Sequence, residues 1–409
     1  MTQKINFAKL TGLVALLLTA AMALPLSAQD AVFNGSISND WNDADNWSPS
    51  GLPSGANPLT EIGTGALGLN VATADISGPL TSDTIAELRV GRGDNTNGTV
   101  NHSAGTLNTS GWSFVGVDGA GGLAQGTYNL SGSGDLQVNG NMFVGLGGGS
   151  GNSSGTFNIS DNSVLSLNGD LASQAGAFVV GANDGNNGVV NQTGGSVTYN
   201  AWMTVGESSG ATGIYNISAG SLNQNSDWLT IGEGGGANGS LNVSGTADIN
   251  LNANGFRVGR FGDGTGSINI DGSTATIDTT GLHLGVDEAF NVSGTANLNY
   301  VADALGVSAI NATDVFLNDG TVSGGSSLGV DLSSYTAGAS EIVLVNVDGS
   351  VTGTFVGLAE GAVVAGTGYR ITYAGGDGND ISLLAVPEPG SMIVLTVGLG
   401  VAAFRRRRR

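Results

Sequence analysis

The dipeptide Val-Gly, or a conservative variant of it, recurs eight times along the middle of the chain at nearly constant intervals. Successive copies are 25, 29, 36, 25, 26, 27 and 26 residues apart. The copies are Val90-Gly91, Val115-Gly116, Val144-Gly145, Val180-Gly181, Val205-Gly206, Ile231-Gly232, Val258-Gly259 and Leu284-Gly285. A fixed period of roughly 20 to 50 residues is the signature of a repeat architecture, in which each copy is one supersecondary unit. We call this dipeptide the VG pair.

Two further landmarks follow each VG pair. An apolar residue before Asn comes first, at Val100-Asn101, Tyr128-Asn129, Phe157-Asn158, Val190-Asn191, Tyr215-Asn216, Leu241-Asn242, Ile268-Asn269 and Phe290-Asn291. A short alternating run comes next, as in GTLNT from 105, DLQV from 135, SVLSL from 163, GSVTY from 195, GTADINL from 245 and GTANLNY from 294. Each copy therefore holds three stretches with period-two alternation, separated by small and polar residues, which is typical of strands and turns.

One copy cannot bury its apolar face alone, so the copies must stack. Stacking in register places equivalent residues about 4.8 Å apart, joins coils by parallel ladders and aligns Asn above Asn. We therefore predict an all-β chain, a right-handed parallel β-helix of about eight or more coils with three strands each. A β-propeller is not expected, because its blades need about 40 to 45 residues, and the pattern of leucine-rich repeats is absent. An antiparallel sandwich would not require identical residues at a fixed period.

The N-terminus predicts export. Two lysines precede an uncharged apolar stretch from Leu10 to Ala23, and small residues follow it. This order is typical of a secretory signal peptide, here residues 1–28, with cleavage between Ala28 and Gln29.

The C-terminus combines Val386-Pro387-Glu388-Pro389, an apolar stretch from Ser391 to Phe404, and five arginines. The uncharged segment from Gly390 to Phe404 has fifteen residues. A helix of that length rises about 22 Å, short of the roughly 30 Å hydrocarbon core, so we predict a short, weakly anchoring transmembrane helix. The arginines would stay on the cytoplasmic side of the inner membrane.

This three-part order resembles the PEP-CTERM sorting-signal family, with Val386 to Pro389 as the motif. The resemblance implies transient retention in the inner membrane, followed by recognition and cleavage near the motif by an exosortase-type enzyme. It also implies a final place on the cell surface or in the extracellular matrix of a Gram-negative bacterium. Members typically belong to bacteria that make exopolysaccharide or biofilm matrix, so matrix components are expected partners.

The body of the chain is similar to the autotransporter-associated repeat proteins. This similarity rests on the repeat, on DWNDADNWSPSGLPSGA at 40–56 and on YRITYAGGDGNDISLLA at 369–385. It implies the β-helix and says little about activity. An autotransporter would carry its own outer-membrane barrel at the C-terminus, and here the PEP-CTERM-like tail occupies that place.

These landmarks divide the chain into five parts. They are the signal peptide at 1–28, an N-terminal cap at 29–87, the β-helix repeats at 88–300, C-terminal β coils and a cap at 301–385, and the sorting signal with its transmembrane helix and arginine tail at 386–409.

The charge balance excludes some partners. The chain has 33 acidic and 12 basic residues and a formal net charge of -21. Nucleic acid is therefore not an expected partner, because the body would repel a phosphate backbone. The absence of cysteine excludes disulfides and thiolate metal sites.

An acidic residue follows most VG pairs by a few positions. The series is Asp94, Asp118, Asp184, Glu207, Glu233, Asp263 and Asp287. Paired carboxylates are the groups that glycoside hydrolysis uses. However, these acids recur once per coil in glycine-rich segments, so we interpret them as a solvated stripe without neighbouring arginine or histidine, with weak cation binding left open.

The two histidines offer no catalytic pairing. His283 occupies an outward slot and is predicted to be exposed, and His102 occupies an inward slot and is interpreted as a packing defect. No recurrent Ser-His pairing indicates nucleophilic catalysis. We expect no catalytic residue, no cofactor and no bound metal, and the asparagines of the repeat are interpreted as a ladder rather than as glycosylation sites.

One apolar strip stands out on the predicted surface. Phe114, Phe143 and Val179 occupy the outward slot before the VG pair in three successive coils. We predict that the insertion at 168–177 folds over this strip; the alternative is an exposed contact surface for a partner or a second copy.

The expected function is that of an exported, non-enzymatic surface or matrix protein, a β-helical scaffold or adhesin. Two alternatives stay open: a polysaccharide lyase or hydrolase on the same fold, and a carbohydrate-binding protein. The second would use Trp41, Trp47, Trp112, Trp202 or Trp228 as stacking platforms.

Overall fold

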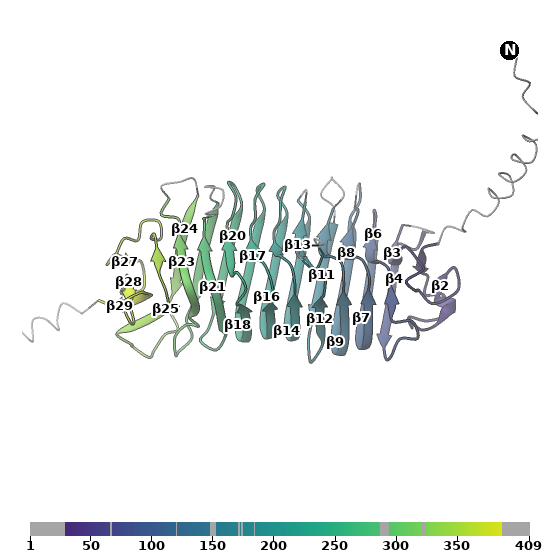
Figure 1. Cartoon of the computed structure of the whole chain (residues 1–409), viewed down its shortest axis with the longest axis horizontal. Coiled ribbons are helices and arrows are strands. Elements are labelled where there is room, and N and C mark those ends of the chain that lie inside the picture. Colours follow the sequence, from purple (N-terminus) through teal and green to yellow (C-terminus); the bar gives the residue numbers. More distant parts are fainter. Residues whose placement is uncertain are drawn as a thin grey trace, which may run out of the picture.

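The computed structural model describes residues 29–386, apart from 66–67, 120, 148–152, 171, 173–174, 184, 287–293 and 321–323. The chain winds about ten turns around one long axis, and the coils stack side by side along that axis (Figure 1). Strands of neighbouring coils run in the same direction. The predicted all-β, parallel β-helix with more than eight coils is therefore confirmed.

The first sheet carries the VG pairs, and we call it the VG sheet. Its strands pair in parallel from β1 onward. They are β1 (Ala31–Phe33), β3 (Thr60–Thr64), β6 (Leu88–Arg92), β8 (Ser113–Val117), β10 (Met142–Leu146), β13 (Phe178–Ala182), β15 (Met203–Val205), β17 (Leu229–Ile231), β19 (Phe256–Val258) and β26 (Val351–Thr352).

The second sheet, the Asn sheet, carries the apolar-Asn landmark, and several of its strands bend into the third sheet without a break. These long strands are β7 (Thr96–Thr109), β9 (Ala124–Val138), β14 (Asn187–Tyr199), β16 (Thr212–Gln224) and β18 (Asn238–Leu251). The shorter members are β4 (Val71–Ser77), β11 (Ser153–Ile159), β20 (Thr265–Asp271), β22 (Thr295–Val301) and β24 (Gly325–Asp331).

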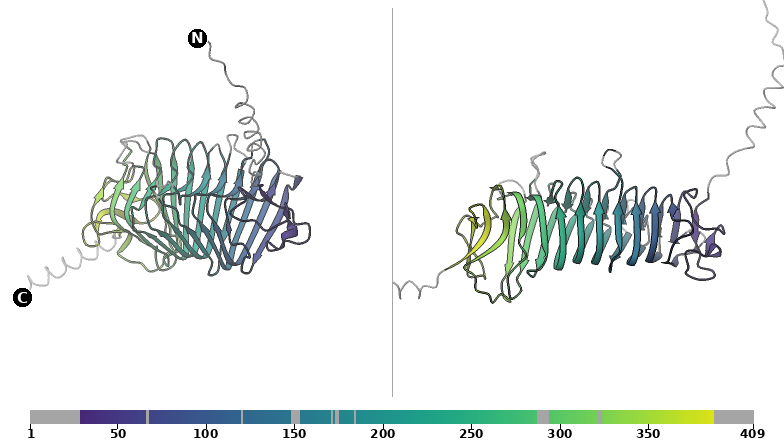
Figure 2. Two further views of the ribbon diagram at one scale, coloured as in Figure 1. Left: turned by 45° about the vertical axis from the view of Figure 1, so that its right-hand side comes forward. Right: turned by 60° about the horizontal axis from the view of Figure 1, so that its bottom comes forward.

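The third sheet closes each coil. Its separate strands are β5 (Thr84–Ile85), β12 (Val164–Leu167) and β25 (Glu341–Val347). Two more strands, β21 (Thr276–Leu284) and β23 (Ile310–Leu317), run from the third sheet into the VG sheet. The three sheets surround the long axis of the solenoid (Figure 2). The buried apolar side chains between them form one continuous cluster.

Alternation along the strands fills that core. In β16 the side chains of Tyr215 and Ile217 point inward and are buried, while Asn216 between them is half-buried on the outside. Equivalent inward residues stack between coils, as do the rings of Tyr128 and Phe157, whose centroids are 5.1 Å apart. Burial of this column removes apolar surface from water in every coil, which is the main driving force for folding.

The outward asparagines form the predicted amide ladder. In each coil the side-chain NH₂ donates to the amide oxygen of the preceding coil, and the first acceptor is the carboxylate of Asp75. Eight such bonds, 2.6–2.9 Å long, join Asp75, Asn101, Asn129, Asn158, Asn191, Asn216, Asn242, Asn269 and Asn299. The ladder explains the recurrent asparagine without glycosylation.

The assignment of Phe290-Asn291 as the eighth landmark was wrong. Ile268-Asn269 of β20 pairs with Leu298-Asn299 of β22, so the run GTANLNY is the second stretch of its coil rather than the third. The connection from Gly285 to β22 is longer than in earlier coils, and this shifts the landmark eight residues along the chain. The third stretch follows in β23, and parallel coils therefore continue beyond residue 300.

The N-terminal end is covered by an aromatic cluster. β2 (Trp47–Ser48) pairs antiparallel with β1, and a short 3₁₀ helix, η1 (Ala44–Asn46), precedes it. The Trp47 ring meets Phe33 and Trp41 edge to face, with centroids 5.0 and 4.8 Å away, and its indole N–H donates to the carbonyl of Trp41. The cluster closes the first coil with large buried side chains.

The C-terminal end is covered by antiparallel strands. β29 (Asp380–Ala385) pairs with β25 and with β28 (Tyr369–Gly375), and β28 pairs with β27 (Val363–Val364). This change of direction ends the parallel ladder, since an antiparallel hairpin leaves no equivalent edge for a further coil.

Removal of one whole coil is expected to leave the fold intact. Val205 and Ile231 occupy equivalent positions, so deletion of 206–231 joins matching points of two coils and lets Asn191 bond to Asn242. We expect a β-sheet circular dichroism spectrum and a cooperative thermal transition, because each repeat contacts only its neighbours. Deletion of 206–218 alone puts the columns out of register and should abolish that transition. Equal behaviour of the two deletions would contradict the repeat register.

Candidate functional site

The outer surface of the VG sheet presents two columns of side chains. The column before the pair consists of the residues directly preceding each VG pair: Arg89, Phe114, Phe143, Val179, Thr204, Thr230, Arg257 and His283. The column after the pair consists of Arg92, Val117, Leu146, Ala182, Glu207, Glu233 and Arg260. Both change character along the axis, from charged to apolar and back to charged.

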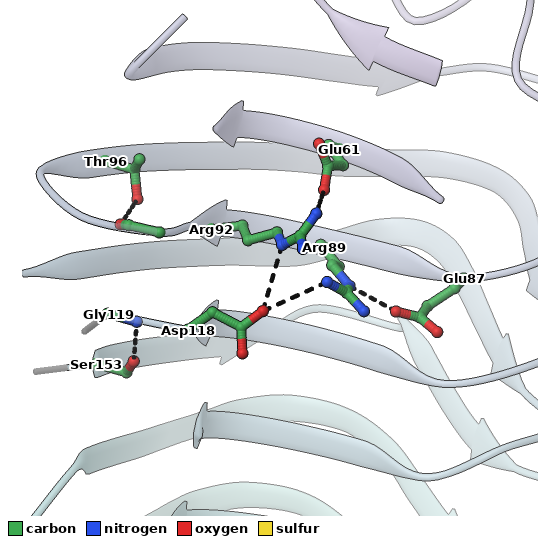
Figure 3. A network of polar contacts seen from close by, with 9 residues as sticks. Glu61, Glu87, Arg89, Arg92, Thr96, Asp118, Gly119 and Ser153 are labelled. Carbon is green, nitrogen blue, oxygen red and sulfur yellow. Dashed lines mark hydrogen bonds and ion pairs between the residues drawn. The ribbon is translucent and has the colours of Figure 1, made fainter. Parts of the chain in front are cut away.

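Charged residues begin these columns at the N-terminal end. Arg92 pairs with Glu61 of β3 and lies 3.3 Å from a carboxylate oxygen of Asp118, and Arg89 also approaches Asp118 (Figure 3). Arg89 contacts Glu87 in turn. The Glu61 side chain is 1% exposed, so its charge is compensated within the protein rather than by water. The network is a structural element of the first coils, because its groups satisfy one another.

The apolar strip comes next. The structure places Phe143 in register with Phe114 and Val179, and the two phenylalanine rings stack with centroids 5.4 Å apart. The Trp112 ring lies against both, and the guanidinium of Arg89 lies over Phe114. Phe114 is 5% exposed as a result.

Coverage of the strip by the insertion stays a prediction. Residues 171, 173 and 174 of that insertion lie outside the described residues. Its described ends are held to the previous coil, since Gly176 donates to the carbonyl of Gly140 and Ala177 donates to the Asn141 side chain. The role of the strip as a contact surface likewise stays a prediction.

Glutamates occupy the column after the pair in two adjacent coils. The backbone N–H of Glu207 donates to Gly181 and that of Glu233 donates to Gly206, so both residues continue the parallel ladder. Their side chains are half-buried. The guanidinium of Arg260, one coil further, lies 2.7 Å from a Glu233 oxygen. Ladder geometry therefore brings together two carboxylates and one arginine.

This arrangement corrects the interpretation of the acidic series as a solvated stripe without arginine neighbours. Asp94 and Asp263 are exposed, as expected, but Glu207 and Glu233 are not, and Asp118 and Glu233 both pair with arginine. The slot after each VG pair still belongs to the sheet, so a side chain there lies against the sheet surface. Asp184 and Asp287 lie outside the described residues.

The environment perturbs both glutamates. Burial raises the pKa of the Glu207 carboxyl to about 7, and the neighbouring Glu233 carboxylate adds to the shift. Burial also raises the pKa of Glu233, while Arg260 opposes that shift by favouring the charged form. Near neutral pH the Glu207 carboxyl is therefore close to the midpoint of its titration.

Two hollows meet at these glutamates. One is an open groove of about 690 Å³ that extends from Trp112 and Phe143 to Phe261. The other is a more enclosed pocket of about 250 Å³, whose walls include Trp202, Trp228 and Arg257. Glu207 and Glu233 line both.

The tryptophans divide into two groups. Trp41 and Trp47 are 1% exposed in the N-terminal cluster, so their proposed use as stacking platforms was wrong. Trp112 is 46% exposed, and Trp202 and Trp228 are half-buried. One face of Trp228 is already occupied, because the Arg257 guanidinium lies 3.9 Å from its ring centroid.

The predicted exposure of His283 was wrong, whereas His102 lies inward as predicted but is not a packing defect. His283 is buried, because its ring packs edge-on against Trp228 and stacks on Phe316. His102 is fully buried with both ring nitrogens satisfied: Nε2 donates to the Gly105 carbonyl, which leaves Nδ1 to accept from the Tyr128 hydroxyl. Burial lowers the pKa of His102, so the ring is neutral and structural.

Sequence reasoning missed Leu146, Arg260 and Phe261 as lining residues of the site. A signal for the first two was present, since both occupy the slot after the VG pair that also contains Glu207. Aligning that slot across coils, as was done for the slot before the pair, would have revealed the column.

Changing Glu207 to Gln is expected to stabilise the protein at neutral and alkaline pH but not at acid pH. The raised pKa means that the folded chain holds this proton more tightly than the unfolded chain. The Glu207 carboxylate therefore does not destabilise the folded protein at about pH 4, and it destabilises the protein fully above about pH 7. We expect the free energy of unfolding to rise by about 1–2 kcal/mol at about pH 8, since the group is partly exposed, and to stay unchanged at about pH 4. Urea denaturation measures both, with Asp263→Asn as an exposed control; an equal gain at both pH values would contradict the assignment.

The predicted sorting and export segments fall largely outside the described residues. Of Val386, Pro387, Glu388 and Pro389, only Val386 is described, and it follows directly on β29. Ala28 is not described, whereas Gln29 is exposed and its carbonyl accepts from Asn57. Signal peptide, cleavage position and tail helix therefore stay predictions. Within the described residues, no helix has the length and apolar character needed to cross a membrane.

Comparison with known families and proteins yields one match. The PEP-CTERM protein-sorting motif matches residues 385–409. No curated protein and no solved structure matches the chain. The similarity of the repeats to autotransporter-associated proteins therefore stays a prediction.

The matched motif indicates how the protein is sorted. PEP-CTERM signals are recognised by exosortase, so an exosortase is a partner of this chain. The motif indicates an exported protein that passes through the membrane on its way to the cell surface. The protein is thus a parallel β-solenoid that carries a PEP-CTERM sorting motif.

Proposed function

We propose that the protein is a non-enzymatic surface or extracellular-matrix protein whose solenoid serves as a stiff scaffold or adhesin. The observation that supports this proposal is the uninterrupted ladder of eight side-chain amide bonds along the Asn sheet. About ten turns at about 4.8 Å each give a rod of roughly 50 Å. Parallel ladders on all three sides resist bending of such a rod.

The acidic surface suits a hydrated polysaccharide environment, and exopolysaccharide or another matrix component is the proposed partner. A net charge of -21 keeps the rods apart and soluble. In this setting a Gram-negative, biofilm-forming host is the expected source.

Fractionation of producing cells tests the scaffold role. The mature protein should sediment with the extracellular matrix and be released when the matrix polysaccharide is digested. Recovery of the protein entirely in the soluble medium, with intact matrix in the pellet, would contradict a structural role there.

A glycan panel tests the non-enzymatic character. The competing function, a polysaccharide hydrolase or lyase, is favoured by one observation: two adjacent glutamates, one of which has a pKa of about 7, line a groove. We expect the purified protein to leave the chain length of acidic and neutral glycans unchanged. Turnover that disappears in Glu207→Gln or Glu233→Gln would show that the protein is an enzyme.

A further inference from the structure

The open groove on the VG sheet is lined by both apolar and acidic side chains. The apolar ones are Trp112, Phe143, Leu146 and Phe261. Among the described residues, the charged side chains that line it are Glu207 and Glu233. Aromatic surface next to carboxylates is the combination that recognises an organic cation, because ring faces and carboxylates both attract positive charge.

The charge balance identifies the carboxylate available to a ligand. Arg260 pairs with Glu233 at 2.7 Å and also lies over the Phe261 ring. Arg257 is held over Trp228. Among the described residues, no ion pair or hydrogen bond reaches the Glu207 side chain, and the charge that acts on it most is that of Glu233. Glu207 is therefore the carboxylate that a cation would neutralise.

We propose that this groove binds a glycan through a protonated amino group, with the ammonium on Glu207 and the apolar faces of the sugar rings against the exposed Trp112. The proposal rests on the proposed surface role in one respect: a protein at the cell surface or in the matrix encounters glycans. It adds the ligand class, an amino sugar polymer, and the residues that select it.

The shape of the groove favours a sugar chain over a peptide. The groove is open and crosses successive coils, which are spaced by about 4.8 Å. A pyranose unit in an extended β-linked chain is about as long as one coil rise, so consecutive sugars can lie over consecutive coils. Aromatic side chains in the lining suit the flat, CH-rich faces of pyranose rings, and a free amine on such a ring supplies the cation.

The proposal is tested with matched oligosaccharides and the purified full-length chain. We would titrate a β-1,4-linked glucosamine hexamer, its fully N-acetylated counterpart and cellohexaose by calorimetry at neutral pH. The glucosamine hexamer should bind at least tenfold more tightly than the other two, which lack the charge. In Glu207→Gln this preference should disappear, while Asp263→Asn, an exposed acid of the same series, should keep it.

Several outcomes would overturn the proposal. These are equal affinity for the free and acetylated hexamers, an unchanged preference in a correctly folded Glu207→Gln, or hexalysine binding as tightly as the glucosamine hexamer. Trp112→Ala should weaken the binding of all three sugars about tenfold, and unchanged affinities would exclude Trp112 from the site. Cleavage of the hexamer that is lost in Glu207→Gln would leave the ligand class standing and refute the non-enzymatic function instead.

Discussion

Gly181→Ala is expected to lower the free energy of unfolding by about 4 kcal/mol or more. Gly181 has φ +72°, a conformation that L-residues rarely adopt, and a Cβ there would overlap the carbonyl oxygen of Thr212 in the next coil. The overlapping atom belongs to the backbone of a paired strand, so it cannot move aside without breaking the ladder. Urea denaturation followed by circular dichroism measures the loss.

Gly185→Ala is the matched control. Gly185 has φ +74°, almost the same backbone conformation, but nothing lies within 4 Å of a Cβ built there. Its replacement by Ala should lower the free energy of unfolding by about 1–2 kcal/mol, the cost of placing an L-residue in the left-handed conformation. Similar losses in the two variants would show that backbone conformation, and not close packing of coils, requires glycine in the VG pair.

Arg92→Met is expected to destabilise the protein by about 3–5 kcal/mol, because it leaves the buried Glu61 carboxylate without its cation. Among the described residues, no other arginine pairs with Glu61, since Arg89 contacts Glu87 and Asp118 instead (Figure 3). The methionine side chain fills much of the same volume, so the loss reports on charge rather than on a cavity. Chemical denaturation at neutral pH provides the measurement.

Adding Glu61→Gln to Arg92→Met should recover most of this loss, since a neutral amide is far less costly to bury than an unpaired carboxylate. Arg370→Met serves as the second control, because Arg370 is exposed and its guanidinium bonds to a backbone carbonyl, that of Gly361, rather than to a buried carboxylate. A change within about 0.5 kcal/mol is expected there. A double variant no more stable than Arg92→Met would assign the effect to packing.

The core and the ladders were predictable because every coil repeats the same alternation of inward and outward residues. The alternation of Tyr215, Asn216 and Ile217 gave the inward face, and the common period gave the amide ladder and the register of Phe114 with Phe143. A prediction of this kind needs only that equivalent residues align, and the sequence contains that information directly.

The candidate site was less predictable because it depends on what covers each outward slot. His283 is buried by Trp228, two coils before it, and by Phe316, which lies in a segment where the period is no longer visible. The position of Asn299 was missed for a related reason, since the length of a connection is not fixed by the repeat. Glu207 and Glu233 were treated as turn residues although the ladder continues through them.

The two ends of the solenoid differ, and this gives the molecule a direction. Val386 leaves from the antiparallel strands at one end, while Trp41 and Trp47 lie at the other (Figure 1). A molecule tethered through the residues after Val386 would stand upright on its support, with the tryptophan cluster as its tip. A polymer bound at Glu207 would then pull on the rod several coils away from the tether. That force would tilt the whole rod rather than unfold coils from its free end.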